Sequence, residues 1–126
     1  MRILWALPVT LIGLLPGLIN LLFGGTLRRE GIALEATGPA IRMMLWLLNP
    51  PARIEAITFG HVILARDAAT ARRLRLHEHV HVRQTERWGI LFPPAYLAAS
   101  AFAWLRGGDA YWDNCFEQEA HAAEAR

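Results

Sequence analysis

The sequence predicts an α+β fold that is mostly helical, with a small β-sheet or hairpin and a hydrophobic helix in front of it. Three features lead to this expectation: residues 3–23 carry no charge, residues 31–38 and 54–65 have strand character next to glycines, and amphipathic helical segments follow. At 126 residues the chain has the size of one domain. We therefore expect a hydrophobic anchor in residues 1–25 and a folded domain in residues 26–126.

The first hydrophobic segment is long enough to cross a membrane. As a helix, its 21 residues would extend about 30 Å, the thickness of the hydrocarbon core. The whole chain is 54% hydrophobic and only 19% charged, which also favours a membrane. A cleaved signal peptide and a hydrophobic arm buried in the domain or a partner are the alternatives. Pro8 and Pro16 weaken the spanning helix, while the absence of an Ala-x-Ala site weakens the signal peptide.

The remaining elements follow from local pattern. Residues 54–65 are expected to form a strand or hairpin with Gly60 at a bend or bulge. Asp67 or Thr70 is expected to cap a long helix that Gly89 ends. The apolar run 90–105 is interrupted by two prolines, so it is too short to span a bilayer and suits a core, interfacial or re-entrant helix. The expected elements are a strand in 31–38, a helix in 40–49, a strand or hairpin in 54–65, a helix in 66–88, a turn at 107–109 and a helix in 114–126.

The expected long helix contains a metal-binding pattern, HEHVH at residues 77–81. His77 and His81 are four residues apart, so a helix places both imidazoles on one face with their Cβ atoms about 5–6 Å apart. Glu78 lies on the flank of that face, where its carboxylate could take a proton from a metal-activated water. The alternative is a polar, solvated helix face near a membrane surface. His79 points away from this face, and we expect it to be a solvated surface residue.

A catalytic zinc ion requires a third protein ligand, and the C-terminal helix offers candidates. Glu117 and His121 are four residues apart and share a face, while Glu119 lies on another face. Glu117, Glu119 and His121 are therefore the candidates for the third ligand. A capping box between Asn114 and Glu117 is the structural alternative, because a polar residue followed three positions later by Glu is a common helix start.

The pair of motifs HEHVHVRQ and FEQEAHAAE resembles the gluzincin branch of zinc metallopeptidases, and the small size resembles the minigluzincins. The resemblance covers residue 54 to the C-terminus and implies a zincin-like domain. It implies zinc on His77, His81 and Glu117, with Glu78 as the general base. In that family an Asp four residues after the Glu ligand orients the first His. This chain has His121 there, which departs from the family pattern.

The resemblance also implies how such a site would work. The strand in residues 60–65 would line the cleft as an edge to which an extended peptide adds. Zinc would lower the pKa of its water, Glu78 would accept the proton, and the resulting hydroxide would attack a peptide carbonyl. His61, Tyr96 and Tyr111 have the chemistry to stabilise the oxyanion, although each could equally be a packing residue.

The leading hypothesis is a membrane-anchored zinc metallopeptidase that cleaves a peptide or protein substrate and contacts membrane lipid. The first alternative is a non-catalytic structural subunit of a membrane protein complex, built on a peptidase-like domain. A metal-binding or regulatory module without a substrate is the second alternative. Nucleic-acid binding is not expected, because the net charge of +2 is spread along the chain without a basic stripe.

Overall fold

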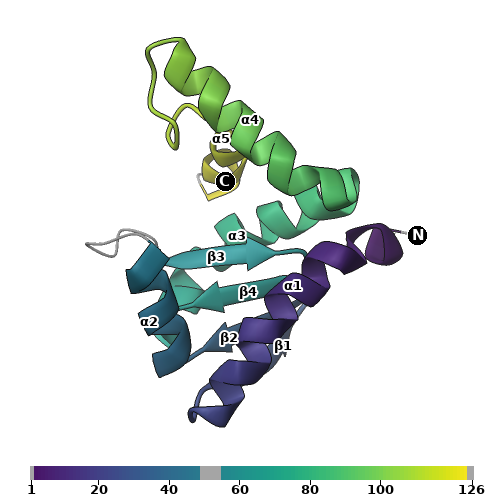
Figure 1. The fold of residues 1–126 in the computed structure, drawn as a ribbon, viewed down its shortest axis with the longest axis vertical. Helices are drawn as coiled ribbons and strands as arrows, with labels where there is room; N and C mark the ends of the chain where they lie inside the picture. Colours follow the sequence, from purple (N-terminus) through teal and green to yellow (C-terminus); the bar gives the residue numbers. More distant parts are fainter. Residues whose placement is uncertain (1, 49–54, 125–126) are drawn as a thin grey trace.

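The computed structural model describes residues 2–48 and 55–124, and it confirms an α+β fold with an N-terminal apolar helix (Figure 1). A four-stranded mixed sheet lies between helices. In chain order the elements are α1 (Arg2–Leu22), β1 (Thr26–Glu30), β2 (Ala33–Thr37), α2 (Pro39–Leu48), β3 (Ala56–Phe59), β4 (Val62–Ala65), α3 (Ala68–Trp88), the short 3-10 helix η1 (Gly89–Leu91), α4 (Phe92–Leu105) and α5 (Cys115–Glu124).

The strand order is β1-β2-β4-β3, so β3 is an edge strand of the sheet that the described residues form. β4 pairs in parallel with β2 and antiparallel with β3, and it is therefore the inner strand of its hairpin. Gly60 makes the tight turn of that hairpin with a φ of 62°. The expectation that the strand in residues 60–65 forms the edge of a cleft is thus wrong. The parallel pairing with β2, which no local pattern reveals, moves β4 inward.

β1 was not expected from the sequence. Its residues, TLRRE, are mostly exposed and pair antiparallel with β2 through a two-residue turn. Arginines and a glutamate on an outer strand are typical of sheet edges, where charge discourages pairing with other chains. The alternation of apolar and polar residues that marks a half-buried strand is therefore absent from β1.

Helix α1 packs on the sheet, crossing in front of it in Figure 1. Gly13 allows this approach, because a Cβ atom there would lie 2.8 Å from the Cβ of Phe59. Asn20 is fully buried, and its side-chain amide donates to the carbonyls of Thr26 and Thr37 at 3.3 and 2.9 Å. One face of α1 therefore belongs to the core of the domain, while its opposite face is exposed.

The two faces of the sheet are covered by different helices. On one face Val62 and Leu64 of β4 pack with Ile41 and Leu45 of α2, next to α1. On the other face Ile63 packs with Ala33 and with Val82 of α3. Because side chains alternate along a strand, the β-branched and aliphatic run of β4 is buried on both sides. This arrangement fixes α3, which carries the HEHVH segment, against the sheet.

By length and composition, two helical stretches of the described residues are apolar enough to cross a membrane: Leu4–Leu22, and Ala68–Leu105, which combines α3, η1 and α4. The same properties are found in core helices of soluble proteins and in signal sequences. The N-terminal apolar helix is thus present as expected, with one face packed on the sheet.

Candidate metal centre

Helix α3 presents the two histidines of the motif on its buried face. Asp67 is the N-cap, since its Oδ1 accepts a hydrogen bond from the Thr70 amide at 2.7 Å, and Gly89 ends the helix with a φ of 62°. His77 and His81 lie one turn apart and are 4% and 7% exposed, so water solvates neither imidazole freely. Their burial is unlike that of a solvated polar helix face.

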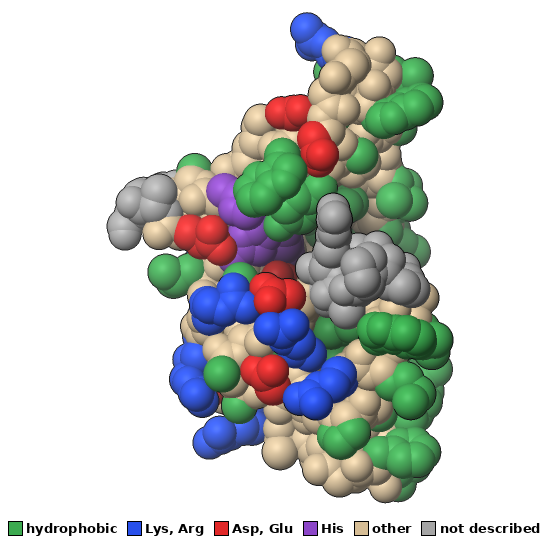
Figure 2. All heavy atoms as spheres, turned by 90° about the vertical axis from the view of Figure 1, so that its left-hand side faces the viewer, with side chains coloured by type: hydrophobic (Ala, Val, Ile, Leu, Met, Phe, Trp, Pro, Cys, Tyr) green, Lys and Arg blue, Asp and Glu red, His purple; other side chains and the backbone are tan. Residues whose placement is uncertain are grey.

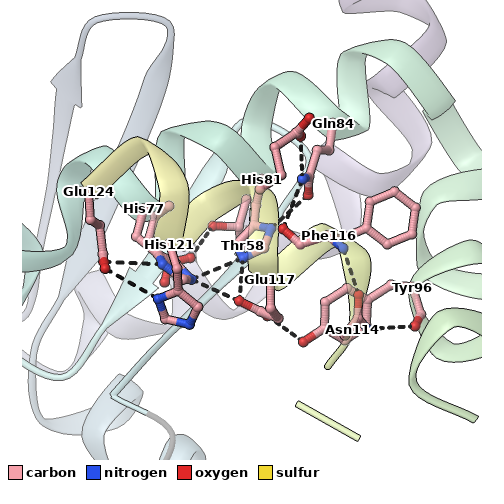
Figure 3. A network of polar contacts seen from close by, with 12 residues as sticks. Thr58, His77, His81, Gln84, Tyr96, Asn114, Phe116, Glu117, His121 and Glu124 are labelled. Atoms are coloured by element: carbon pink, nitrogen blue, oxygen red, sulfur yellow. Dashed lines mark hydrogen bonds and ion pairs between the residues drawn. The ribbon is translucent and has the colours of Figure 1, made fainter. Parts of the chain in front are cut away.

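Helix α5 brings Glu117 to this pair (Figure 3). Glu117 Oε1 lies 2.9 Å from His77 Nε2 and 3.2 Å from His81 Nε2, and the two imidazole nitrogens are 3.3 Å apart. Glu117 itself is 4% exposed. Two imidazoles and one carboxylate therefore point their lone-pair atoms at a common position, as the sequence analysis expected.

The spacing of these three atoms fits a metal ion. Ligand atoms about 2.1 Å from a tetrahedral zinc ion are separated from one another by about 3.4 Å. The three observed distances, from 2.9 to 3.3 Å, are close to that value. His77, His81 and Glu117 thus form a buried group that could hold a metal ion.

The alternatives for the third ligand make other contacts, and His121 forms a second candidate group with His77 and Glu124. Glu119 accepts a hydrogen bond from the Gln84 amide at 2.7 Å, and His121 Nδ1 lies 3.3 Å from Glu124. The capping-box alternative for Glu117 also fails, because its carboxylate points to the histidines. Asn114 caps the helix alone, since its Oδ1 accepts the Phe116 amide at 2.8 Å.

We call His77, His81 and Glu117 the triad. Its electrostatics reflect one carboxylate shared by two imidazoles. Burial is the largest influence and opposes protonation of His77 and His81, but their hydrogen bonds to Glu117 and the charges of Glu117 and Glu78 together outweigh it and raise the pKa of both imidazoles. Burial likewise opposes ionisation of Glu117, yet the two imidazoles hold the pKa of its carboxyl well below the ordinary value. The buried carboxylate and the two imidazoles therefore stabilise one another's charged forms.

The nitrogen atom on the far side of each imidazole also faces a polar group. His81 Nδ1 lies 2.8 Å from Gln84 Oε1, which can only accept, so this contact leaves Nε2 free to bind a metal. His77 Nδ1 lies 3.1 Å from Glu124 Oε1, although the contact does not have hydrogen-bond geometry. A carboxylate therefore does stand beside His77, but it comes from Glu124 and not from position 121.

Sequence reasoning missed both of these groups. Gln84 follows His81 by three residues on the same helix face, and a polar amide on a buried face was the available signal. Glu124 follows Glu117 by two helical turns, which places it on the same side of α5. His121, the position implied by the family pattern, instead stacks on Trp112 with ring centroids 4.8 Å apart.

Glu78 lines a cleft next to the triad. The cleft has a volume of about 400 Å³ and is bounded by β3, α3, α4, α5, one residue of α1 and Tyr111. Glu78 is 6% exposed, and its Oε2 accepts a hydrogen bond from Thr58 Oγ1 of β3 at 2.7 Å. Burial, partly offset by the two imidazoles, raises the pKa of the Glu78 carboxyl. A buried carboxyl with a raised pKa beside a candidate metal-ligand set has the chemistry of a general acid or base.

Of the three residues considered for oxyanion stabilisation, two line the cleft and one does not. Tyr96 and Tyr111 line the cleft, and the Tyr96 hydroxyl donates to Glu117 Oε2. Burial, followed by the nearby Glu117, raises the pKa of both phenols, so both keep their protons. His61 does not line the cleft; its ring lies between Thr10 Oγ1 and Glu86 Oε2, 3.2 Å from each.

His79 differs from its expected role as a solvated surface residue. It is half-buried, and its Nε2 lies 3.0 Å from the carbonyl oxygen of Glu30 in β1. Its Nδ1 lies 2.9 Å from the carbonyl oxygen of Arg75. The expectation failed because β1 itself was missed. His79 is still excluded from the ligand set, as the helical spacing indicated.

Glu117 therefore joins His77 and His81, whereas Glu119, His61 and His79 make other contacts. Comparisons with models of protein families, with curated proteins and with solved structures give no match for this chain.

Proposed function

We propose that this chain is a membrane-associated zinc metallopeptidase, with zinc on His77, His81 and Glu117 and with Glu78 as the general base. The observation that carries the proposal is the convergence of two imidazoles and a carboxylate from separate helices, 2.9 to 3.3 Å apart, at the wall of a cleft. Two nitrogen ligands and one oxygen ligand form a set typical of catalytic zinc, which keeps its fourth position open.

The residues around the site support hydrolysis of a peptide. When bound, zinc supplies an activated water and polarises the carbonyl that the water attacks. Glu78 lines the same cleft as the ligands, and Thr58 fixes its carboxylate, so it is placed to take a proton and pass it to the leaving amine. Within the part of the chain that the structure describes, β3 is an edge strand, which supports binding of an extended substrate. The likeness of HEHVH and FEQEAH to gluzincin motifs adds to this support.

Membrane association is the second part of the proposal. The support is the exposed apolar face of α1, which includes Leu4, Leu11, Leu15, Leu18 and Leu22. Because the opposite face of α1 packs on the sheet, we propose that α1 anchors the domain while it remains part of it. Exposed apolar surface of this extent is typical of membrane or protein interaction sites.

Hydrolysis can be tested with the zinc-loaded chain in nonionic detergent and a mixture of internally quenched peptides. We expect cleavage that a chelator stops and added zinc restores. Glu78→Gln should retain zinc and lose at least about a hundredfold in rate, since general acid–base catalysis contributes roughly 10²–10⁴-fold. Equal rates for the wild type and Glu78→Gln would show that the cleavage comes from a contaminant or from another mechanism.

The same apolar surface favours one alternative, a structural subunit of a membrane protein complex. Trp46 on α2 and Trp104 on α4 are 52% and 68% exposed, and large exposed aromatic side chains are frequent at protein interfaces. Mild extraction from native membranes separates the two functions. A stoichiometric larger assembly, together with zinc binding but no cleavage, would favour the subunit over the peptidase.

A further inference from the structure

The cleft beside the candidate metal centre is almost entirely apolar beyond the centre itself. Val9 of α1, Phe59 of β3, and Phe92, Pro93 and Leu97 of α4 line it. Among the described lining residues, the only carboxylates and imidazoles are those of Glu78 and the triad. A charged substrate side chain would lose its water there without gaining an opposite charge, which is costly, whereas an apolar side chain would gain from burial.

The wall formed by β3 favours an extended chain. All four residues of β3, Ala56–Phe59, line the cleft, and among the described strands β3 pairs with β4 alone. A peptide lying along β3 could add main-chain hydrogen bonds to this edge. Thr58 pairs with Ile63 and turns its side chain toward Glu78, so the strand also sets the distance between such a peptide and the base.

The rim of the cleft belongs to the apolar surface of the molecule. Leu97 lines the cleft and is also 68% exposed, so it connects the cleft to the outer face of α4. Val9 is the contribution of α1, and residues 3–23 and 90–105 contain no charged side chain. Both helices lie toward the viewer in Figure 1, and the corresponding right-hand side of Figure 2 carries hydrophobic side chains from top to bottom.

Charged side chains gather elsewhere, toward the left and centre of Figure 2. Arg75 with Glu35 and Arg73 with Glu55 form ion pairs between α3 and neighbouring segments. An uncharged apolar surface next to a charged one is typical of proteins that insert one face into a bilayer. A cleft framed by these two apolar helices would then open at the level of the lipid.

We propose that this cleft takes an extended, uncharged apolar segment of a membrane-inserted polypeptide, seated along β3 between α1 and α4. The inference rests on the proposed function, because it assumes that the cleft is the substrate site of the metal centre. It adds the substrate class: an unwound apolar stretch at the lipid boundary, with large aliphatic or aromatic side chains next to the scissile bond.

Binding can be measured apart from cleavage with zinc-loaded Glu78→Gln in nonionic detergent. Fluorescently labelled peptides carry either Leu-Phe or a Glu or Lys pair at the same central positions, and anisotropy gives their affinities. We expect the apolar peptide to bind at least about tenfold more tightly. Leu97→Lys should remove this preference. Leu105→Lys, a change on the same helix at a residue that is 75% exposed and does not line the cleft, should preserve it.

A second experiment tests whether the bound segment comes from a membrane-inserted polypeptide or from a free peptide. The apolar sequence is placed beside a transmembrane helix in phosphatidylcholine–phosphatidylglycerol vesicles, or is offered as a free peptide at the same total concentration. We expect at least about tenfold greater occupancy by the membrane-inserted form. Equal occupancy by the free peptide, or equal affinity for the charged peptides, would overturn the inference.

The zinc content of each sample separates the two possible failures. If zinc is held by His77, His81 and Glu117 and the wild type cleaves the quenched peptides but no apolar preference appears, the inference is wrong and the proposed function stands. If the chain holds no zinc at these residues, the proposed function itself fails.

Discussion

Glu117 Oε1 lies 2.9 Å from His77 Nε2, although the two residues are 40 positions apart in the chain. The contact joins α5 to α3 and completes a group of three ligand atoms with His81. Two features of α5 hold it in place. Asn114 donates from its side-chain amide to the Tyr96 carbonyl and to Ser100 Oγ of α4, and the Gln84 amide of α3 donates to the Phe116 carbonyl.

Removal of the third ligand should abolish tight metal binding. Glu117→Ala leaves two imidazoles without a carboxylate, so we expect zinc affinity to fall by more than about a hundredfold, beyond the 10–100-fold typical of an outer partner. Chelator competition measures the affinity. Glu119→Gln is the matched control on the same helix, because its amide oxygen can still accept from Gln84. Similar losses in the two variants would contradict the assignment of Glu117.

Glu124 should matter for metal binding more than His121 does. Its carboxylate faces the non-ligating nitrogen of His77, and such a partner orients a ligating imidazole and raises its basicity. We expect Glu124→Ala to weaken zinc binding by about 10–100-fold. His121→Phe keeps a ring against Trp112 and should have a smaller effect. The opposite ranking would assign the orienting role to position 121, as the family pattern implies.

Two glycines of α1 test whether this helix is part of the domain. A Cβ at Gly13 would lie 2.8 Å from the Phe59 Cβ and 3.0 Å from the Val62 Cβ, whereas at Gly17 the nearest atom is the Ala36 Cβ at 3.7 Å. Gly13→Ala should therefore destabilise the fold by about 1–3 kcal/mol through overpacking. Gly17→Ala should be neutral or stabilise it by up to about 1 kcal/mol through helix propensity.

Urea unfolding in detergent measures both variants. Opposite signs for the two substitutions support packing of α1 on the sheet. Equal effects at the two positions would mean that α1 leaves the sheet in solution, as a free membrane anchor would.

Metal affinity should fall as the pH is lowered. Zinc binds the neutral imidazole, and the raised pKa of His77 and His81 means that protons compete with zinc already above 6.5, the ordinary histidine value. Below the raised pKa, affinity should fall roughly tenfold per pH unit for each imidazole that must lose a proton. Titrations between about pH 5.5 and 8 check this. A pH-independent affinity would exclude the histidines as ligands.

The two candidate histidine ligands could be predicted from the sequence because both lie on α3 and their relative position is fixed by local helix geometry. His77 and His81 lie one turn apart on any helix, and the helix boundaries at Asp67 and Gly89 follow from capping chemistry. Glu117 was within reach of prediction because the FEQEAH motif resembles a family pattern. Glu124 was not, because the family pattern points to position 121 and only the packing of α5 against α3 brings Glu124 beside His77.

The order of the strands in the sheet also could not be predicted from local sequence pattern. A strand or hairpin with Gly60 at a bend or bulge was expected, but which strand forms the edge depends on the pairing of β4 with β2, about 28 residues away in the chain. β1 was not predicted because an exposed, charged edge strand lacks the alternation of apolar and polar residues that marks a half-buried strand. The apolar character of α1 was evident, whereas its packing through Gly13 depends on the complementary surface of β3 and β4.

The most direct test of the account is an anomalous difference map at the zinc absorption edge, from crystals of the zinc-loaded chain. We predict one strong peak, within about 2.0–2.2 Å of His77 Nε2, His81 Nε2 and a Glu117 carboxylate oxygen. A peak elsewhere, or a refined site in which Glu117 does not reach the ion shared by the two imidazoles, would contradict the proposed metal centre.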